Sequence, residues 1–284
     1  QPRRLRHDKH AGTYVGRRAV FRLKNAVLVV ALAGITSIAA ASVGGGMISA
    51  WVFDDGTAND VMGVNDGIIH GASFGAGKVG GAIDLNGVDN YVEIPHDSSM
   101  DVMANGYTVS AWTLVRSTSA SIDHGGIVFK GEKIGWGPLF LFRAATVSDT
   151  DMTWGACSDG VEGWFRTDAV YNLGEWTHIA LTADGATVIG YVNGEIVESA
   201  GQANPIDVAG PYLLFPDYPM ELGVGRAVGG TVGNDSFSDA LIDEVSIWSL
   251  PLTQSEIRTK LINGSVAVEA KGKATVTWAS LKTK

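Results

Sequence analysis

The chain has 284 residues, of which 45% are hydrophobic, 18% are charged and 37 are glycine. This hydrophobic content is enough for a sizeable core, so disorder of the whole chain is excluded. Abundant glycine with few charges favours many short strands joined by tight turns over long surface helices. An all-β domain is therefore expected.

The charge is divided unevenly along the chain. The formal net charge is −9. Residues 1–25 carry +7 and residues 263–284 carry +3, which leaves −19 for the residues between them. Such acidity disfavours nucleic acid as a partner, because binding to it relies on Lys and Arg that neutralise phosphates. It also disfavours polyanionic glycans unless a cation mediates the contact.

The basic N-terminal segment leads into an apolar run. Residues 26–41 read AVLVVALAGITSIAAA and end in small side chains. A basic region, an apolar stretch and an A-x-A end together predict a secretory signal peptide over residues 1–41, followed by a linker at 42–46. This predicts bacterial export to a secreted or cell-surface location. An uncleaved N-terminal anchor is the alternative, although the run is short for a span of about 20 residues.

From residue 48 onward the pattern is one of strands. Residues 49–53 form an aromatic-rich run that ends at Asp54-Asp55-Gly56, and residues 81–85 end at Asn86-Gly87. Clusters of Gly, Asn and Asp after β-rich runs mark turns. Further strands are expected over residues 91–94, 107–114, 126–129, 139–142, 176–181 and 240–248.

The firmest local pattern is a hairpin. Residues 187–192 and 195–198 are β-rich and are separated only by Asn193-Gly194. This dipeptide supplies the two positive-φ residues of a type I′ turn. Strand, turn and strand are therefore predicted here.

One helix signal occurs near the end. Thr253 and Glu256 fit a capping box, Ile257 and Leu261 follow at i, i+4 spacing, and Asn263-Gly264 is a stop signal. Many short strands with a single short C-terminal surface helix predict a two-sheet antiparallel β-sandwich rather than a parallel α/β sheet.

Five blocks of sequence carry a family pattern. They are AWVFDDGTANDVMGVNDGIIHG (50–71), GKVGGAIDLNGVDNYVEIP (77–95), YTVSAWTLV (107–115), GEWTHIALTADGATVIGYVNGEIV (174–197) and LIDEVSIWSLPLTQSEI (241–257). In this order they resemble the laminin-G-like domains of secreted bacterial proteins, which have the concanavalin A-like lectin/glucanase jelly roll. The resemblance implies such a domain over residues 47–262, with a short basic tail at 263–284.

The resemblance has gaps at residues 116–173 and 205–219. In such sandwiches the variable loops carry recognition, so the segments that would identify a ligand are those where the resemblance stops. The implied function is a non-catalytic binding or adhesion module for carbohydrate or an extracellular protein. A structural surface spacer without a discrete ligand is an alternative.

Catalysis is a further alternative, because the same fold houses glycoside hydrolases and other polysaccharide-active enzymes. These need two carboxylates about 5 to 9 Å apart. The Glu-x-Asp-x-x-Glu arrangement that such hydrolases place on one strand is absent. Adjacent acids such as Asp54-Asp55 and Asp243-Glu244 point to opposite faces of a strand. A catalytic pair would have to come from different strands, so no catalytic residue is assigned.

The acidic residues suit calcium better, since Ca²⁺ takes six to eight oxygen ligands from flexible loops. A jelly roll of this kind brings its first and last strands side by side, which would place Asp54 near Asp243. The resemblance implies one structural calcium site there, with Asp60 and Asp89 as further candidate ligands. Alternatively, Asp54 and Asp55 cap a turn with Gly56, and Asp243 accepts bonds from loop amides.

Tryptophans are the candidate ligand contacts. Trp136, Trp154 and Trp164 lie in Gly-rich or polar surroundings typical of loops. The flat C–H faces of sugars stack on such rings, so these three side chains are the predicted carbohydrate contacts. The alternative is that the rings plug the ends of the sandwich.

Overall fold

The computed structural model describes residues 46–117, 125–131, 140–144, 152–158, 161–167, 171–197, 203–225, 236–263, 267–268 and 276–277. The predicted signal segment at 1–41 and the linker at 42–46, apart from Gly46, lie outside these residues. In the part that is described, no helix is long and apolar enough to cross a membrane.

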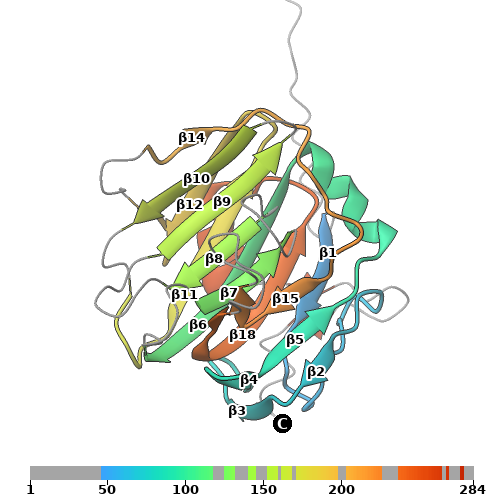
Figure 1. Cartoon of the computed structure of the whole chain (residues 1–284), viewed down its shortest axis with the longest axis vertical. Coiled ribbons are helices and arrows are strands. Elements are labelled where there is room, and N and C mark those ends of the chain that lie inside the picture. Colours follow the sequence, from blue (N-terminus) through green and yellow to red (C-terminus); the bar gives the residue numbers. More distant parts are fainter. Residues whose placement is uncertain are drawn as a thin grey trace, which may run out of the picture. The chain divides into compact units, whose positions relative to one another are not determined.

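The described chain forms two antiparallel sheets that lie one over the other (Figure 1). Sheet A has nine strands in the order β13-β12-β11-β6-β18-β4-β3, with β1 also paired to β18 and β14 to β12. Its strands are β1 (Met47–Trp51), β3 (Ser73–Ala76), β4 (Gly81–Asn86), β6 (Tyr107–Ser117), β11 (Thr177–Ala183), β12 (Thr187–Val192), β13 (Glu195–Ile196), β14 (Ile206–Asp207) and β18 (Asp239–Trp248).

Sheet B has seven strands in the order β10-β9-β8-β7-β15-β5-β2. Its strands are β2 (Ile68–His70), β5 (Tyr91–Ile94), β7 (Gly125–Lys130), β8 (Phe140–Ala144), β9 (Met152–Ser158), β10 (Val161–Thr167) and β15 (Met220–Leu222). Two short pairs complete the description, β16 (Val224–Gly225) with β17 (Ser236–Phe237) and β19 (Ala267–Val268) with β20 (Val276–Thr277). The predicted all-β, two-sheet antiparallel sandwich is confirmed.

The core lies between the sheets and follows strand alternation. On β5, Val92 and Ile94 are fully buried, whereas Tyr91 and Glu93 are only partly buried. On β15, Met220 and Leu222 join the same core, so Glu221 between them lies on the opposite face. Sheet B therefore has an outer face that carries polar side chains.

The β12–β13 hairpin is confirmed. Asn193 and Gly194 have φ values of 50° and 78°, which a type I′ turn requires. The second strand, β13, ends at Ile196 and is shorter than expected.

The C-terminal helix is also confirmed, together with its capping box from Thr253 to Glu256. It begins as α1 (Gln254–Glu256) and continues as the π-helix η3 (Ile257–Ile262). Ile257 packs with Trp248 and Leu252 on the outer side of sheet A.

A second helix, the 3₁₀-helix η1 (Ser98–Asn105), was not expected. Asp97 caps its first turn through the amide of Ser99, and Met100 and Met103 are buried. Two apolar residues at i, i+3 are too weak a periodic signal to predict a helix from sequence.

Strand β18 changes its partner half-way along one edge. Its residues Asp239–Ile242 pair with β4, and its residues Val245–Trp248 pair with β1. A register shift separates the two stretches, and Glu244 there has a φ of 49°. The first and last long strands are thus side by side, as expected for this fold.

His178 on β11 is a buried polar group of sheet A. Its side chain packs edge-on against Trp112, with ring centroids 5.2 Å apart, and its Nδ1 has no hydrogen-bond partner among the described residues. Burial lowers the pKa of His178 to about 3. The folded protein therefore keeps this imidazole neutral.

This burial predicts acid sensitivity. Between pH 6.5 and 3 the unfolded chain binds a proton at His178 that the folded chain does not, so the free energy of unfolding falls as pH falls, by about 3 kcal/mol at pH 4.5. In His178→Leu this contribution is removed, and urea unfolding at pH 7 and 4.5 is expected to show a smaller difference than in wild type. Equal acid losses in the two proteins would contradict the prediction.

Candidate functional site

Asp54 and Asp243, the two main predicted metal ligands, lie at one loop. Asp54 Oδ1 accepts a hydrogen bond from the amide of Gly81 at 2.8 Å, and Asp243 Oδ2 accepts one from the amide of Val79 at 2.9 Å. Gly80, between these amides, has a φ of 66°, and a Cβ on it would overlap Asp54 Oδ1. The two carboxylates therefore hold the Gly77–Gly81 loop next to the partner change of β18.

Asp60 has a different role from the one expected. Its side chain is almost fully buried, with 4% exposed. Oδ1 accepts from the amides of Ala50 and Met62, and Oδ2 from those of Val64 and Asn65. Both oxygens are thus engaged by backbone, so Asp60 organises the loop after β1.

Asp89 lies in the β4–β5 turn. Its Oδ1 accepts from the side-chain amides of Asn86 and Asn90. Among the residues that the structure describes, no group of three or more His, Cys, Asp or Glu is arranged to hold a metal ion. The four predicted ligands therefore do not form one site, and only Asp54 and Asp243 lie together.

Of the three predicted tryptophan contacts, Trp154 and Trp164 lie on strands and not in loops. Trp154 lies on β9 and is fully buried in the core, where its Nε1 donates to Thr167 Oγ1 at 3.0 Å. Its ring cannot stack on a sugar in this position, which corrects the predicted exposure. Trp164 lies on strand β10, with its side chain outside the described set, and Trp136 lies wholly outside it.

The hydrogen-bonded register of sheet B places one residue from each of its seven strands in a single row across the sheet. Ile68 on β2 pairs with Glu93, Glu93 with Glu221, and Glu221 with Phe129 on β7. The row then continues through Leu141, Gly155 and Trp164 at the far edge. At about 4.8 Å per strand spacing it extends roughly 29 Å. Trp164 thus has a backbone position in the same row as two carboxylates.

The β2–β5 end of this row forms an exposed cluster, here named the sheet-edge patch, of Ile68, His70, Tyr91 and Glu93. The rings of His70 and Tyr91 are stacked, with centroids 4.2 Å apart and planes 7° from parallel. His70 Nε2 lies 3.3 Å from Glu93 Oε2. Ile68 is 50% exposed, and the His70 and Glu93 side chains are 37% and 33% exposed. Apolar, aromatic and carboxylate groups therefore meet at one accessible place.

The Glu93–Glu221 pair is the arrangement of carboxylates that sequence reasoning missed. The two residues are 128 positions apart and become direct cross-strand neighbours only through the β5–β15 register. Such neighbours have Cβ atoms about 5 Å apart. Glu221, however, is only 1% exposed. A substrate has no access to that carboxylate in this arrangement.

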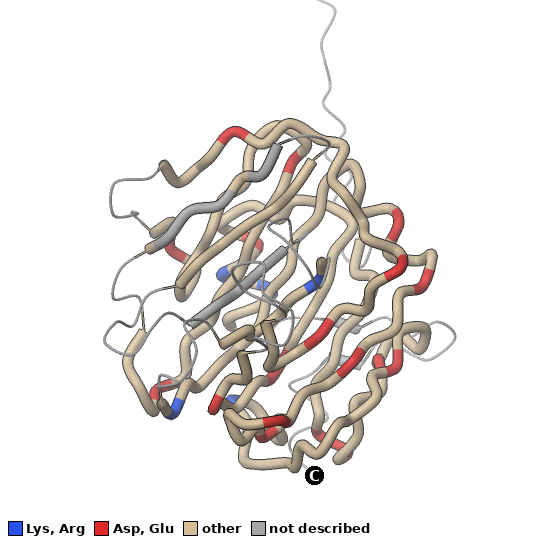
Figure 2. Tube along the Cα trace, in the orientation of Figure 1, with Lys and Arg blue, Asp and Glu red and all other residues tan. Residues whose placement is uncertain are grey.

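The acidic residues are concentrated around this end of the sandwich. Residues 54–101 contain nine Asp or Glu and a single Lys or Arg, Lys78. Figure 2 shows acidic positions along β4, β5 and the loops beside them. The surroundings of the sheet-edge patch therefore carry negative charge.

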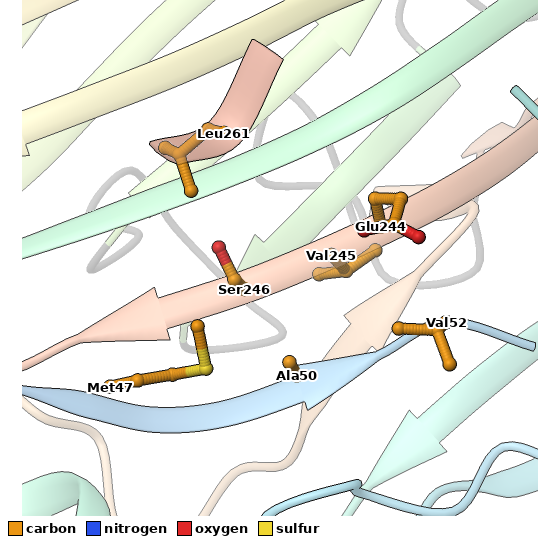
Figure 3. A pocket seen from close by; sticks show the side chains of 7 residues that line it. All are labelled: Met47, Ala50, Val52, Glu244, Val245, Ser246 and Leu261. Carbon is orange, nitrogen blue, oxygen red and sulfur yellow. The ribbon is translucent and has the colours of Figure 1, made fainter. Parts of the chain in front are cut away.

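A pocket lies on the other sheet, between β1, β18 and η3 (Figure 3). Met47, Glu244, Ser246 and Leu261 are among its lining residues. Its volume is ≈ 20 Å³, room for about one water molecule. It is too small for a sugar or a peptide side chain.

Comparison with known proteins places the sequence pattern in a family. A family model described as "Concanavalin A-like lectin/glucanases superfamily" matches residues 86–258. A comparison with curated proteins finds no match.

Solved structures share the fold at low sequence identity. Domain 4 of an extracellular GH43 arabinanase from Geobacillus stearothermophilus, solved in complex with arabinotriose, has a TM-score of 0.52 and 20% identity, covering 75% of this chain and 97% of that one. The binding domain of botulinum neurotoxin DC has a TM-score of 0.54 and 10% identity in a complex with SialylT. In a complex with rat synaptotagmin II these values are 0.56 and 11%.

Both neurotoxin comparisons cover 75% of this chain and 50% of that one. This chain therefore spans about half the length of those binding domains.

The role of Asp60 is testable by substitution. Asp60→Ala leaves four backbone donors without their acceptor, so we expect the free energy of unfolding in urea to fall by about 3 kcal/mol or more. Asp55→Ala, at an exposed carboxylate of the same loop that bonds Thr57, is the control and should lose at most about 1 kcal/mol. Similar losses in both variants would contradict the assigned role.

Proposed function

Because the chain belongs to the concanavalin A-like lectin/glucanases superfamily, we propose that it is a non-catalytic binding module, secreted or at the cell surface, that recognises carbohydrate. The observation that carries this proposal is the sheet-edge patch. Its exposed His70 ring offers a stacking surface, and Glu93 offers an acceptor for sugar hydroxyls.

The charge of the domain narrows the ligand class. Residues 54–101 supply nine acids and one base around the patch. An acidic glycan would meet like charge there, whereas a neutral glycan would not. We therefore propose neutral oligosaccharides as ligands. The arabinotriose complex of the arabinanase domain supports this class.

A glycoside hydrolase is the second candidate, and the Glu93–Glu221 register pair is the observation that favours it. Two carboxyl groups about 5.5 Å apart suit a retaining mechanism. Catalysis also requires both carboxyls to reach the scissile bond, and Glu221 is 1% exposed. Binding without hydrolysis is therefore the preferred proposal.

The proposal predicts which residues matter for binding. In calorimetric titrations with arabinotriose, xylotriose, cellotriose and maltotriose, we expect at least one neutral trisaccharide to bind wild type. His70→Ala and Glu93→Gln should weaken its Kd at least about tenfold, or roughly 1.4 kcal/mol. Glu195→Gln, at an exposed carboxylate on the edge of sheet A, is the matched control and should bind as wild type.

Three results would contradict parts of this proposal. Binding of no glycan, together with capture of a purified extracellular protein, would make the module protein-specific. Tighter binding of sialyllactose than of neutral trisaccharides would overturn the charge argument. Release of reducing sugar by wild type but not by Glu221→Gln would establish the hydrolase.

Calcium at Asp54 and Asp243 is a separate part of the proposal. Its support is that both carboxylates bond to one loop and that Asp54 is exposed to solvent. Calcium bound there would supply charge neutralisation between the two acids and tie β1 to β18. Asp60 and Asp89 are not included, because their bonds lie in other turns.

Thermal unfolding with CaCl₂ or EDTA tests the site. We expect calcium to raise the Tm of wild type in a concentration-dependent way, since a ligand of the folded state stabilises it by mass action. Asp54→Asn keeps an acceptor oxygen for the Gly81 amide but loses a charge, so its Tm in EDTA should stay near that of wild type while its calcium response falls. An unchanged wild-type Tm would mean that the two acids only hold the loop.

A further inference from the structure

Residues 203–219, here named the strap, include β14 and end directly before β15. Backbone bonds fix the first half of the strap. Val208 N donates to Ala186 O at 3.0 Å, Tyr212 N to Ala104 O at 2.9 Å, and Leu213 N to Cys157 O at 2.9 Å. Tyr212 is buried and packs edge-on against Tyr107. The strap is therefore anchored to sheet A, sheet B and η1.

The second half of the strap ends in a tight turn from Phe215 to Tyr218. Tyr218 N donates to Phe215 O at 3.0 Å, with Pro216 and Asp217 exposed at the tip. The rings of Phe215 and Tyr218 are in a T-shaped arrangement, with centroids 6.5 Å apart, and both are partly exposed. The turn thus presents two aromatic rings and a carboxylate together.

A buried lysine holds this turn from below. Lys130, at the end of β7, is fully buried, and its Nζ donates to Tyr218 O at 2.6 Å and to Phe215 O at 3.2 Å. Burial lowers the pKa of Lys130 to about 8. Lys130 is therefore a buried donor, and an apolar side chain in its place would leave both carbonyls of the turn without this partner.

The backbone of the turn is also strained. Phe215 has a φ of 48°, in the left-handed region that favours glycine. Strain of this kind persists only where the surrounding structure enforces it, and it is concentrated at sites of ligand contact. The buried Lys130 thus bonds to a four-residue turn that contains a strained aromatic residue, Phe215.

The turn is also close to the sheet-edge patch. Strand β15 begins two residues after Tyr218, and its Glu221 pairs with Glu93 of the patch. Three residue steps lead from Tyr218 to Glu221, at most about 10 Å. The turn is therefore three residue steps and one strand spacing away from Glu93 of the patch.

We propose that the Phe215–Tyr218 turn is a second carbohydrate contact, in which the ring of Tyr218 stacks on a neutral sugar, the Phe215 ring packs on the core and supports it from the side, Asp217 accepts hydroxyl hydrogens of the sugar, and Lys130 is the positioning residue that keeps the turn in shape. This inference rests on the proposed function and adds a site to it.

Calorimetry with the same four neutral trisaccharides tests this site. Asp217→Asn and Tyr218→Ala should weaken the Kd of the best-bound trisaccharide at least about tenfold. Asp207→Asn, at another exposed aspartate of the strap, is the matched control and should bind as wild type. Lys130→Met leaves the carbonyls of Phe215 and Tyr218 without their donor, so it should weaken binding to a similar degree and also lower the Tm. Its Kd is measured at a temperature at which the variant is folded, so that a loss of affinity reports the turn and not unfolding.

The outcomes separate this inference from the proposed function. If wild type binds a trisaccharide and Asp217→Asn and Tyr218→Ala bind it equally well, the turn is not a contact, and the module function stands on the sheet-edge patch. If wild type binds none of the four, both proposals are overturned. If Lys130→Met binds the trisaccharide as tightly as wild type does, the positioning role is overturned.

Discussion

Sheet A depends on the partner change of β18. One edge of this strand pairs throughout with β6, while the other edge pairs first with β4 and then with β1. Where one partner ends and the next begins, backbone groups need other partners, since buried amides without hydrogen bonds are costly. Asp243 lies at this point, and with Asp54 it bonds to the amides of the Gly77–Gly81 loop. The two carboxylates therefore supply hydrogen-bond acceptors at the place where the pairing of β18 with β4 ends and its pairing with β1 begins.

The need for hydrogen-bond acceptors in irregular loops accounts for part of the acidity of the domain. Many of the acids in residues 54–101 accept hydrogen bonds from their own chain. Asp60 binds four amides, Asp89 binds two asparagine side chains, and Asp97 caps η1. Carboxylates are good acceptors for turn amides, and a protein with many irregular turns uses many of them. High acid content here reflects loop architecture as well as surface charge.

Local structures that depend only on neighbouring residues were predicted correctly from the sequence. Asn193-Gly194 and the capping box at Thr253 need only their own neighbours to form, and both are present. The same reasoning was wrong about Trp154, because glycine and polar residues around it read as a loop, whereas in the structure they belong to a paired strand. Whether a ring is buried depends on strands far away in sequence.

The candidate site shows the same limit. Glu93 and Glu221 belong to strands that are far apart in the sequence. Only the β5–β15 register places the two residues opposite each other. No spacing rule connects them, since the 127 residues between them include strands of both sheets. The placement of Asp54 near Asp243 was predictable, by contrast, because it follows from the pairing of first and last strands that the family pattern implies.

The polar residues of the two sheets therefore have different roles. In sheet A, Asp54, Asp243 and the neutral His178 are tied to backbone or packed against rings, so they serve the fold. In sheet B, His70 and Glu93 remain accessible on the outer face, and the turn above Lys130 stays partly exposed although its support is fully buried. Polar groups that bond only within the chain stabilise it. Polar and aromatic groups that are fixed in place yet exposed have their orientation settled before a ligand arrives, which reduces the entropy lost on binding. The sheet-edge patch and the Phe215–Tyr218 turn are where this second condition is met.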